Sequence, residues 1–302
     1  MQLAHLVIVA CTSITVSSAG TWSNAAPLPE PLQELSAAVL KGRIYVAGGI
    51  NTQNEGTTAA YRYDPATNQW ERIADIPDSR HHMPLVVVND SLYLVGGYAV
   101  PGFTPTRSLF LYEETRDQWL GRELLPEPRG ASAADAVNGR IVVAGGVGLN
   151  GHVDSIAIYD PGTDTWRHGA PIPTRRDHLT GATVNGIFYA IAGRRSGNYD
   201  VVEAYDLATD TWTTRARMPS RRGGLGGAVL NGRIHTFGGE GPGTYNNHEQ
   251  YDPVTDAWTV LLPLPTARHG IAVAGLGGKV YVIAGGPREG FSQTDVVEVY
   301  TP

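Results

Sequence analysis

Short apolar runs recur along the whole chain, and turn-forming residues separate them. The runs at 141–144 (Ile-Val-Val-Ala) and 281–284 (Tyr-Val-Ile-Ala) contain no alternating polar residue, which is expected of strands that pack on both faces. Asn-Gly pairs at 138–139, 185–186 and 231–232 favour two-residue hairpin turns. Apolar residues at helical spacing are hard to find. The pattern therefore predicts an all-β chain of many short antiparallel strands.

A unit of 45 to 49 residues repeats along the chain. In each unit a glycine pair ends an apolar run, and the pairs begin at Gly48, Gly96, Gly145, Gly238 and Gly285, with a degenerate copy at Gly193-Arg194. The six tryptophans keep the same period: Trp22, Trp70, Trp119, Trp166, Trp212 and Trp258. A tyrosine stands seven residues before each of the last five, and a sixth, Tyr300, ends the last unit. We interpret these aromatic residues as core packing units.

Each unit divides into four strands. In the first unit these are Leu35–Leu40, Ile44–Gly48, a strand that ends at Tyr63 and a strand that carries Trp70. The turn between the last two begins with Asp64-Pro65, a pair that favours a type I turn. Four antiparallel strands in a repeat of this length predict a propeller blade.

The order glycine pair, Tyr-Asp-Pro-x-Thr-x-x-Trp and Pro-x-x-Arg resembles the kelch repeat from residue 21 to residue 302. The resemblance implies one domain, a six-bladed β-propeller with four antiparallel strands per blade. The expected blades are 35–73, 84–122, 132–169, 179–215, 225–261 and 270–300 plus 21–26.

The last repeat ends at Tyr300, before it reaches a tryptophan. Thr21-Trp22 followed by Ala26-Pro27 repeats Thr165-Trp166 followed by Ala170-Pro171. We therefore predict that the N-terminal strand completes the last blade and closes the ring, which hides its open edges.

Residues 1–20 differ from the rest of the chain. An apolar run, Leu3–Ala10, precedes Ser17-Ser18-Ala19, which resembles a cleavage site, and the only cysteine, Cys11, follows a lipobox-like segment. These features predict a signal peptide or a lipoprotein signal with a lipid anchor at Cys11, and hence an exported protein that is periplasmic, secreted or lipid-anchored. The alternative is an ordinary start, since no Lys or Arg precedes the apolar run.

Composition argues against some classes of binding partner. The formal net charge of −6 argues against a nucleic-acid binder, which normally carries a basic surface. The body of the chain contains no run of eighteen apolar residues, so we expect no membrane span there. We expect a monomer.

Function on a propeller must come from the loops that line the central funnel. The recurring Arg80, Arg129, Arg176, Arg222 and Arg268 suggest a structural role, with Leu32 in the first blade. In kelch proteins the positions after this arginine and after the glycine pair converge on the axis. Here the candidate funnel residues are Tyr98, His81, Asp177, His178, Arg195, Glu240 and His269. They suit a polar ligand, which is a protein, peptide or glycan; the alternative is a solvated rim without a dedicated ligand.

The histidines raise the question of a metal site. His81 or His82, His178 and His269 come from alternate blades. We expect such loop positions to lie too far apart for ligand bonds of about 2.1 Å. We therefore predict no metal site and no cofactor.

Three functional classes follow from the resemblance. We predict a non-catalytic binding scaffold. The alternative is a carbohydrate-active enzyme similar to the sialic-acid mutarotases, in which Glu240 after the glycine pair would be the acid/base; the arginine expected shortly after it is replaced by Asn246 and Asn247. A copper radical oxidase needs a cysteine cross-linked to a tyrosine, and Cys11 lies outside the repeats. We exclude that class.

Overall fold

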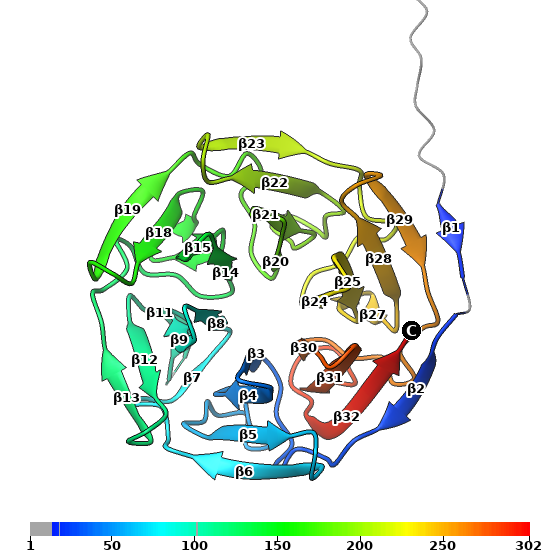
Figure 1. The fold of residues 1–302 in the computed structure, drawn as a ribbon, viewed down its shortest axis with the longest axis horizontal. Helices are drawn as coiled ribbons and strands as arrows, with labels where there is room; N and C mark the ends of the chain where they lie inside the picture. Colours follow the sequence, from blue (N-terminus) through cyan, green and yellow to red (C-terminus); the bar gives the residue numbers. More distant parts are fainter. Residues whose placement is uncertain (1–13, 18, 101) are drawn as a thin grey trace, which may run out of the picture.

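The computed structural model describes residues 14–17, 19–100 and 102–302, so most of the predicted signal, including Cys11, lies outside the described residues. The predicted all-β propeller is confirmed (Figure 1). Six sheets stand around a central axis (Figure 1), and the described residues form no helix that could span a membrane.

Each blade runs from an inner strand at the axis to an outer strand at the rim (Figure 1). Blade 1 contains β3 (Ser36–Leu40), β4 (Arg43–Ala47), β5 (Ala60–Asp64) and β6 (Gln69–Ile73). Blade 2 contains β8 (Leu85–Val88), β9 (Ser91–Val95), β12 (Leu109–Glu113) and β13 (Gln118–Gly121). Blade 3 contains β14 (Ala133–Val137), β15 (Arg140–Ala144), β18 (Ile156–Asp160) and β19 (Thr165–Gly169).

The other three blades have the same antiparallel order. Blade 4 contains β20 (Thr180–Val184), β21 (Ile187–Ile191), β22 (Val202–Asp206) and β23 (Thr211–Thr214). Blade 5 contains β24 (Gly226–Leu230), β25 (Arg233–Phe237), β28 (His248–Asp252) and β29 (Ala257–Val260). Blade 6 contains β30 (Ala272–Leu276), β31 (Lys279–Gly285), β32 (Thr294–Thr301) and β2 (Thr21–Asn24).

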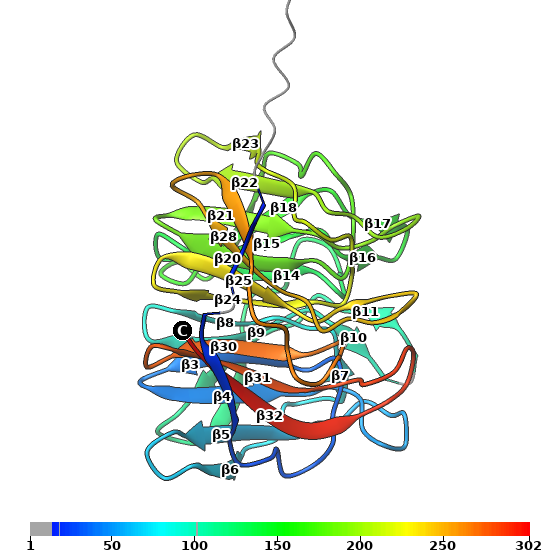
Figure 2. The same ribbon diagram turned by 90° about the vertical axis from the view of Figure 1, so that its right-hand side faces the viewer.

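Short strands lie in the loops that connect the second strand of a blade to its third. These are β10 (Tyr98–Ala99), β11 (Thr104–Pro105), β16 (Val147–Gly148), β17 (Gly151–His152), β26 (Glu240–Gly241) and β27 (Gly243–Thr244). A further short strand, β7 (Arg80–His81), precedes the first strand of blade 2 and pairs with β10. Figure 2 shows β7, β10, β11, β16 and β17 together at one side of the ring. We call this side the loop face; the two-residue hairpin turns lie on the opposite face.

The N-terminal strand closes the ring as predicted. β2 pairs antiparallel with β32, and Trp22 lies opposite Tyr300. The sequence did not predict a further contact: β1 (Thr15–Val16) pairs in parallel with the outer strand β29 of blade 5. The N-terminal segment therefore supplies the outer strand of blade 6 and also pairs with the outer strand of blade 5.

The core lies between the blades. Six clusters of buried apolar side chains form from the described residues, and each joins two neighbouring sheets. A recurring set of hydrogen bonds, which we call the latch, connects the outer strands of neighbouring blades. In blade 4 the Tyr205 hydroxyl donates to Asp210, which also accepts the backbone N–H of Ala170, and Trp212 Nε1 donates to the Ala170 carbonyl at 2.9 Å. Ala170 lies at the end of blade 3, so the latch ties the two blades together.

The same latch recurs in blades 1, 2, 3 and 5, with Asn68, Asp117, Asp164 and Asp256 in the place of Asp210. In blade 6 that place belongs to Gly20, whose φ is 94° and where a Cβ would overlap the Tyr300 ring. The Tyr300 hydroxyl donates instead to the carbonyl of Ala19 at 3.0 Å. The closing blade is thus latched by its own N-terminal segment.

The recurring arginines have the predicted structural role. Each of the five is at most 1% exposed. Arg176, for example, donates to the carbonyls of Ala190 and Ala192 and to Glu203 Oε2 at 2.5 Å. The guanidinium therefore joins the end of β21 to β22.

Candidate functional site

Six pairs of residues, each joined as in a β-bridge, surround the axis at the loop face. In each blade, the residue after the arginine position pairs with the residue after the glycine pair: Gln33 with Ile50, His81 with Tyr98, Gly130 with Val147, Asp177 with Arg194, Gly223 with Glu240 and His269 with Gly286. The bridges direct successive side chains from every blade towards the axis.

These bridges correct the predicted register in blade 4. Ala192 and Gly193, with φ of 57° and 100°, occupy the backbone positions of the glycine pair. Arg194 is consequently the residue that faces the axis, and Arg195 lies one step further, exposed in a turn closed by the bond from its N–H to the Gly197 carbonyl. The prediction of Arg195 as a funnel residue was therefore wrong by one position. In blade 6, Ala284 and Gly285 likewise occupy the positions of the glycine pair, which makes Gly286 the equivalent residue.

The next residue of each blade belongs to a closed ring of backbone hydrogen bonds. Its members are Glu34, His82, Ala131, His178, Gly224 and Gly270. Each N–H donates to the carbonyl of the preceding blade's member, at 2.7–3.0 Å, and the N–H of Glu34 donates to Gly270. All six have left-handed backbone, with φ between 50° and 63°. We call these residues the axial ring.

The axial ring is far tighter than the sequence analysis expected. Metal-ligating atoms of Glu34, His82 and His178 all lie within 4.8 Å of one another. The imidazoles of His82 and His178 have centroids 4.9 Å apart, and His82 Nε2 lies 3.2 Å from Glu34 Oε2. The premise that loop histidines lie too far apart to share a ligand was therefore wrong, because backbone hydrogen bonds join the blades at the axis.

Arg194, Glu240 and His269 flank the axial ring. The Arg194 guanidinium pairs with Glu240 Oε1 and donates to His178 Nε2 at 2.9 Å. His269 Nε2 lies 3.5 Å from Glu240 Oε2 and 3.9 Å from Glu34 Oε1. Glycine makes room for this packing: a Cβ on Gly270 would lie 2.5 Å from Glu34 Oε1. Side chains from four blades therefore meet at one point.

Asp177 orients one side of the cluster. Its Oδ1 accepts the hydrogen bond from His178 Nδ1, and its Oδ2 lies 2.7 Å from His152 Nε2. Burial acts to raise the pKa of Asp177, but the hydrogen bond from His178 and the neighbouring positive charges outweigh it and lower the pKa. Asp177 is thus an ionised carboxylate that orients the His178 ring through its Nδ1.

Aromatic side chains line the other side. His81 Nδ1 lies 2.6 Å from His82 Nδ1, and the Tyr98 ring packs against both imidazoles. Phe103 lies over His81 with ring centroids 4.7 Å apart. Burial lowers the pKa of His81 to about 4 and that of His82 well below its usual value. Both rings are therefore neutral at physiological pH.

The charges at the axis favour a cationic ligand. Three carboxylates, those of Glu34, Asp177 and Glu240, face the single guanidinium of Arg194. Burial raises the pKa of Glu34, and the Arg194 guanidinium is among the groups that oppose this rise. Another positive charge at this point would favour the ionised form of Glu34 and balance the excess of carboxylates.

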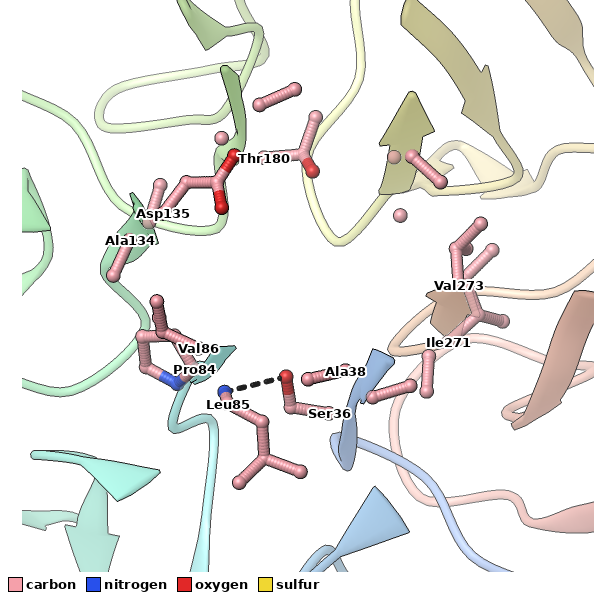
Figure 3. Close-up of a pocket in the computed structure, with 18 of the residues that line it drawn as sticks. Ser36, Ala38, Pro84, Leu85, Val86, Ala134, Asp135, Thr180, Ile271 and Val273 are labelled. Atoms are coloured by element: carbon pink, nitrogen blue, oxygen red, sulfur yellow. Dashed lines mark hydrogen bonds between the residues drawn. The ribbon is translucent and has the colours of Figure 1, made fainter. Parts of the chain in front are cut away.

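A channel continues from the axial ring between the inner strands. Its volume is about 460 Å³, and Glu34, His82 and His178 line one end of it. The wall is mostly apolar or small, and Figure 3 shows Asp135 as a carboxylate that points into it across from Ser36. Burial raises the pKa of Asp135, whose Oδ1 accepts the N–H of Ala136. Small and apolar residues thus make up most of the wall, and polar side chains such as Asp135, Ser36 and Thr180 stand among them (Figure 3).

Of the predicted site residues, the structure brings His81, Tyr98, Asp177, His178, Glu240 and His269 to this cluster. They are largely buried, so they form a packed cluster rather than an open rim. The funnel residues predicted from the sequence did not include Glu34, His82 and Arg194. The signal for the first two was present, because Glu34 and His82 occupy in their blades the position that the predicted His178 occupies in blade 4.

Exposed apolar side chains surround the cluster on the loop face. Phe103, Leu149 and Phe291 are each more than half exposed, and all three lie in loops between the second and third strands of their blades. Loop-face residues thus combine a central charged cluster with apolar positions further out.

Comparisons with known proteins agree with this architecture. The family model for the KLHDC2/KLHL20/DRC7 Kelch-repeats domain matches residues 35–239. Kelch-like protein terF of Aspergillus terreus is 29% identical over 188 residues, which cover 58% of this chain and 41% of that protein. Kelch repeat and BTB domain-containing protein 12 of Homo sapiens is 29% identical over 173 residues, covering 50% of this chain and 28% of that protein. The chain therefore spans less than half the length of these relatives.

A solved structure of YjhT superposes with a TM-score of 0.81 at 16% identity, covering 93% of this chain and 97% of that one. At this identity the likeness shows the fold alone.

Proposed function

Because the family model matches more than half of its length, the chain belongs to the KLHDC2/KLHL20/DRC7 kelch-repeat family, and we propose that it is a non-catalytic scaffold whose loop face binds a polypeptide segment of a partner protein. The observation that carries the proposal is the composition of that face. Exposed Phe103 and Phe291 flank an acidic cluster that is fixed by hydrogen bonds. Aromatic anchors around a polar centre are typical of surfaces that bind peptides.

The excess of carboxylates at the axis indicates which peptide sequences the loop face would prefer. A basic side chain would meet Glu34 and Glu240 at the axis, while an acidic one would be repelled. We therefore expect the preferred segment to carry Lys or Arg between apolar residues.

Peptide display tests this proposal, since a random library requires no identified partner. Peptides selected against the wild-type protein should be enriched in basic and apolar residues. Their affinity, measured by fluorescence polarisation, should fall at least about tenfold for the double variant Phe103→Ser/Phe291→Ser. Val254→Ser is the matched control, because Val254 is 84% exposed in the β28–β29 turn on the opposite face. Selection of no peptide, or equal losses in both variants, would refute the proposal.

A carbohydrate-active enzyme is the second candidate, and one observation favours it. Glu240 is held between the Arg194 guanidinium and the His269 imidazole, so the arginine missing after Glu240 in the sequence is supplied by blade 4. NMR measurement of anomeric exchange in sialic acid and common hexoses tests this candidate, with Glu240→Gln as the comparison. Exchange at the spontaneous rate with both proteins would eliminate it for those sugars.

A further inference from the structure

Three side chains with metal-binding groups point to one place on the axis. Glu34 and His82 are neighbours in the axial ring, and His178 follows after Ala131. The small side chain of Ala131 leaves room for the two imidazoles to pack edge to face, with their centroids 4.9 Å apart. The backbone hydrogen bonds of the axial ring hold all three Cα positions.

The hydrogen bonds of His178 leave one ring nitrogen available. Its Nδ1 donates to Asp177, which a second contact with His152 keeps in place. Nε2 therefore carries a lone pair directed to the axis, where it accepts from Arg194 Nη2 at 2.9 Å. A histidine oriented by a carboxylate through its other nitrogen is the usual arrangement of a metal-binding imidazole.

His82 provides the second ring nitrogen. Its Nδ1 lies 2.6 Å from His81 Nδ1, so the contact with His81 occupies that side of the ring. Its Nε2 lies on the other side of the ring, 3.2 Å from Glu34 Oε2. The ring nitrogen that does not contact His81 is therefore the one directed to the carboxylate.

We propose that the axial ring binds one divalent transition-metal ion through the carboxylate of Glu34 and the Nε2 atoms of His82 and His178. Two imidazoles and one carboxylate form a common set for Zn²⁺, which leaves a fourth position for water or an exchangeable ligand. The Asp177 carboxylate orients His178 through the other ring nitrogen. The ion replaces Arg194 Nη2 as the partner of His178 Nε2, while Glu240 retains the guanidinium. This site does not depend on the proposed binding of a peptide, although the ion and a basic side chain of a bound peptide would compete for Glu34.

Calorimetric titration of the chelator-treated full chain with Zn²⁺ tests the proposal. The expected result is one ion per chain. His178→Gly copies Gly224 and Gly270, which fill the same place in other blades, and it should lower the affinity at least tenfold without loss of the fold. Glu34→Gln should do the same. Asp177→Asn removes the support of His178 and should weaken binding by about tenfold, as such changes do in known metal sites.

Arg194→Met provides the sharpest test. It removes the competing cation, so Zn²⁺ should bind several-fold more tightly, whereas a merely structural cluster would lose stability and gain no affinity. Substitution with Co²⁺ should produce visible absorption of a four-coordinate site in the wild type and not in His178→Gly. His168→Gln removes an exposed histidine of β19 and should change neither measurement. Equal affinities in wild type and His178→Gly, or a loss that follows His168→Gln, would overturn the proposal.

Discussion

The buried ion pair of blade 4 offers a quantitative test of how the blades are held together. Arg176 and Glu203 are at most 3% exposed in their side chains and lie 2.5 Å apart. Removal of one partner from such a pair leaves an uncompensated buried charge, which costs about 3–5 kcal/mol. We therefore expect Arg176→Leu and Glu203→Leu each to reduce the free energy of unfolding by that amount.

Blade 1 indicates what the double variant should do. There the equivalent positions hold Leu32 and Tyr61, both buried in one apolar cluster, so the fold accommodates this site without an ion pair between these two positions. The variant carrying both substitutions should lose less stability than the sum of the two single losses, by at least about 2 kcal/mol.

Urea unfolding followed by tryptophan fluorescence measures all four proteins, and an unchanged m-value would show that the unfolded states are comparable. Additive losses, within about 0.5 kcal/mol, would refute the reasoning, because they would mean that the two charges do not stabilise each other.

Three further predictions concern blade 5, the closing blade 6 and the axial ring. Burial lowers the pKa of His235 to about 4 and that of His248 to about 3, so between these values and about 6.5 the unfolded chain binds protons that the folded chain does not. The free energy of unfolding should therefore fall as the pH drops below about 6.5, by about 2–3 kcal/mol from each histidine at pH 4.5. In urea unfolding at several pH values, His248→Gln should make this dependence less steep. Trp22→Ala should lower the melting temperature far more than an ordinary terminal substitution, since its indole packs on Tyr300 in the closing strand pair; a change below about 2 °C by calorimetry would contradict ring closure. Gly270→Val should displace the Glu34 carboxylate and destabilise the chain by more than about 1 kcal/mol in urea unfolding, because the left-handed backbone of Gly270 excludes a β-branched residue; wild-type stability would contradict this.

Periodicity was sufficient to predict the fold from the sequence. Each blade repeats the same glycine, tyrosine and tryptophan positions, and the displaced Trp22 alone indicated which strand would close the ring. The latch between blades was also present in the sequence, because an Asn or Asp stands two residues before each of the last five tryptophans. Strand β1 could not be predicted, since a parallel pair of two residues leaves no pattern.

The site was predicted only in part, for a geometric reason. The position of Arg194 depends on a left-handed Ala192 that replaces a glycine, so counting from the visible glycines selected Arg195 instead. The distance between His82 and His178 depends on six backbone hydrogen bonds between residues from six repeats. Repeat spacing reveals which residues are equivalent, but it does not reveal how closely equivalent residues approach the axis.

The most direct test of the converging axial site is a crystal structure of the protein equilibrated with Zn²⁺, with anomalous diffraction recorded at the zinc edge. The predicted result is one strong peak about 2 Å from Glu34, His82 Nε2 and His178 Nε2, with the Arg194 guanidinium moved from His178 and still paired to Glu240. Peaks confined to other histidines such as His168, or axial side chains that point away from one another, would contradict the account.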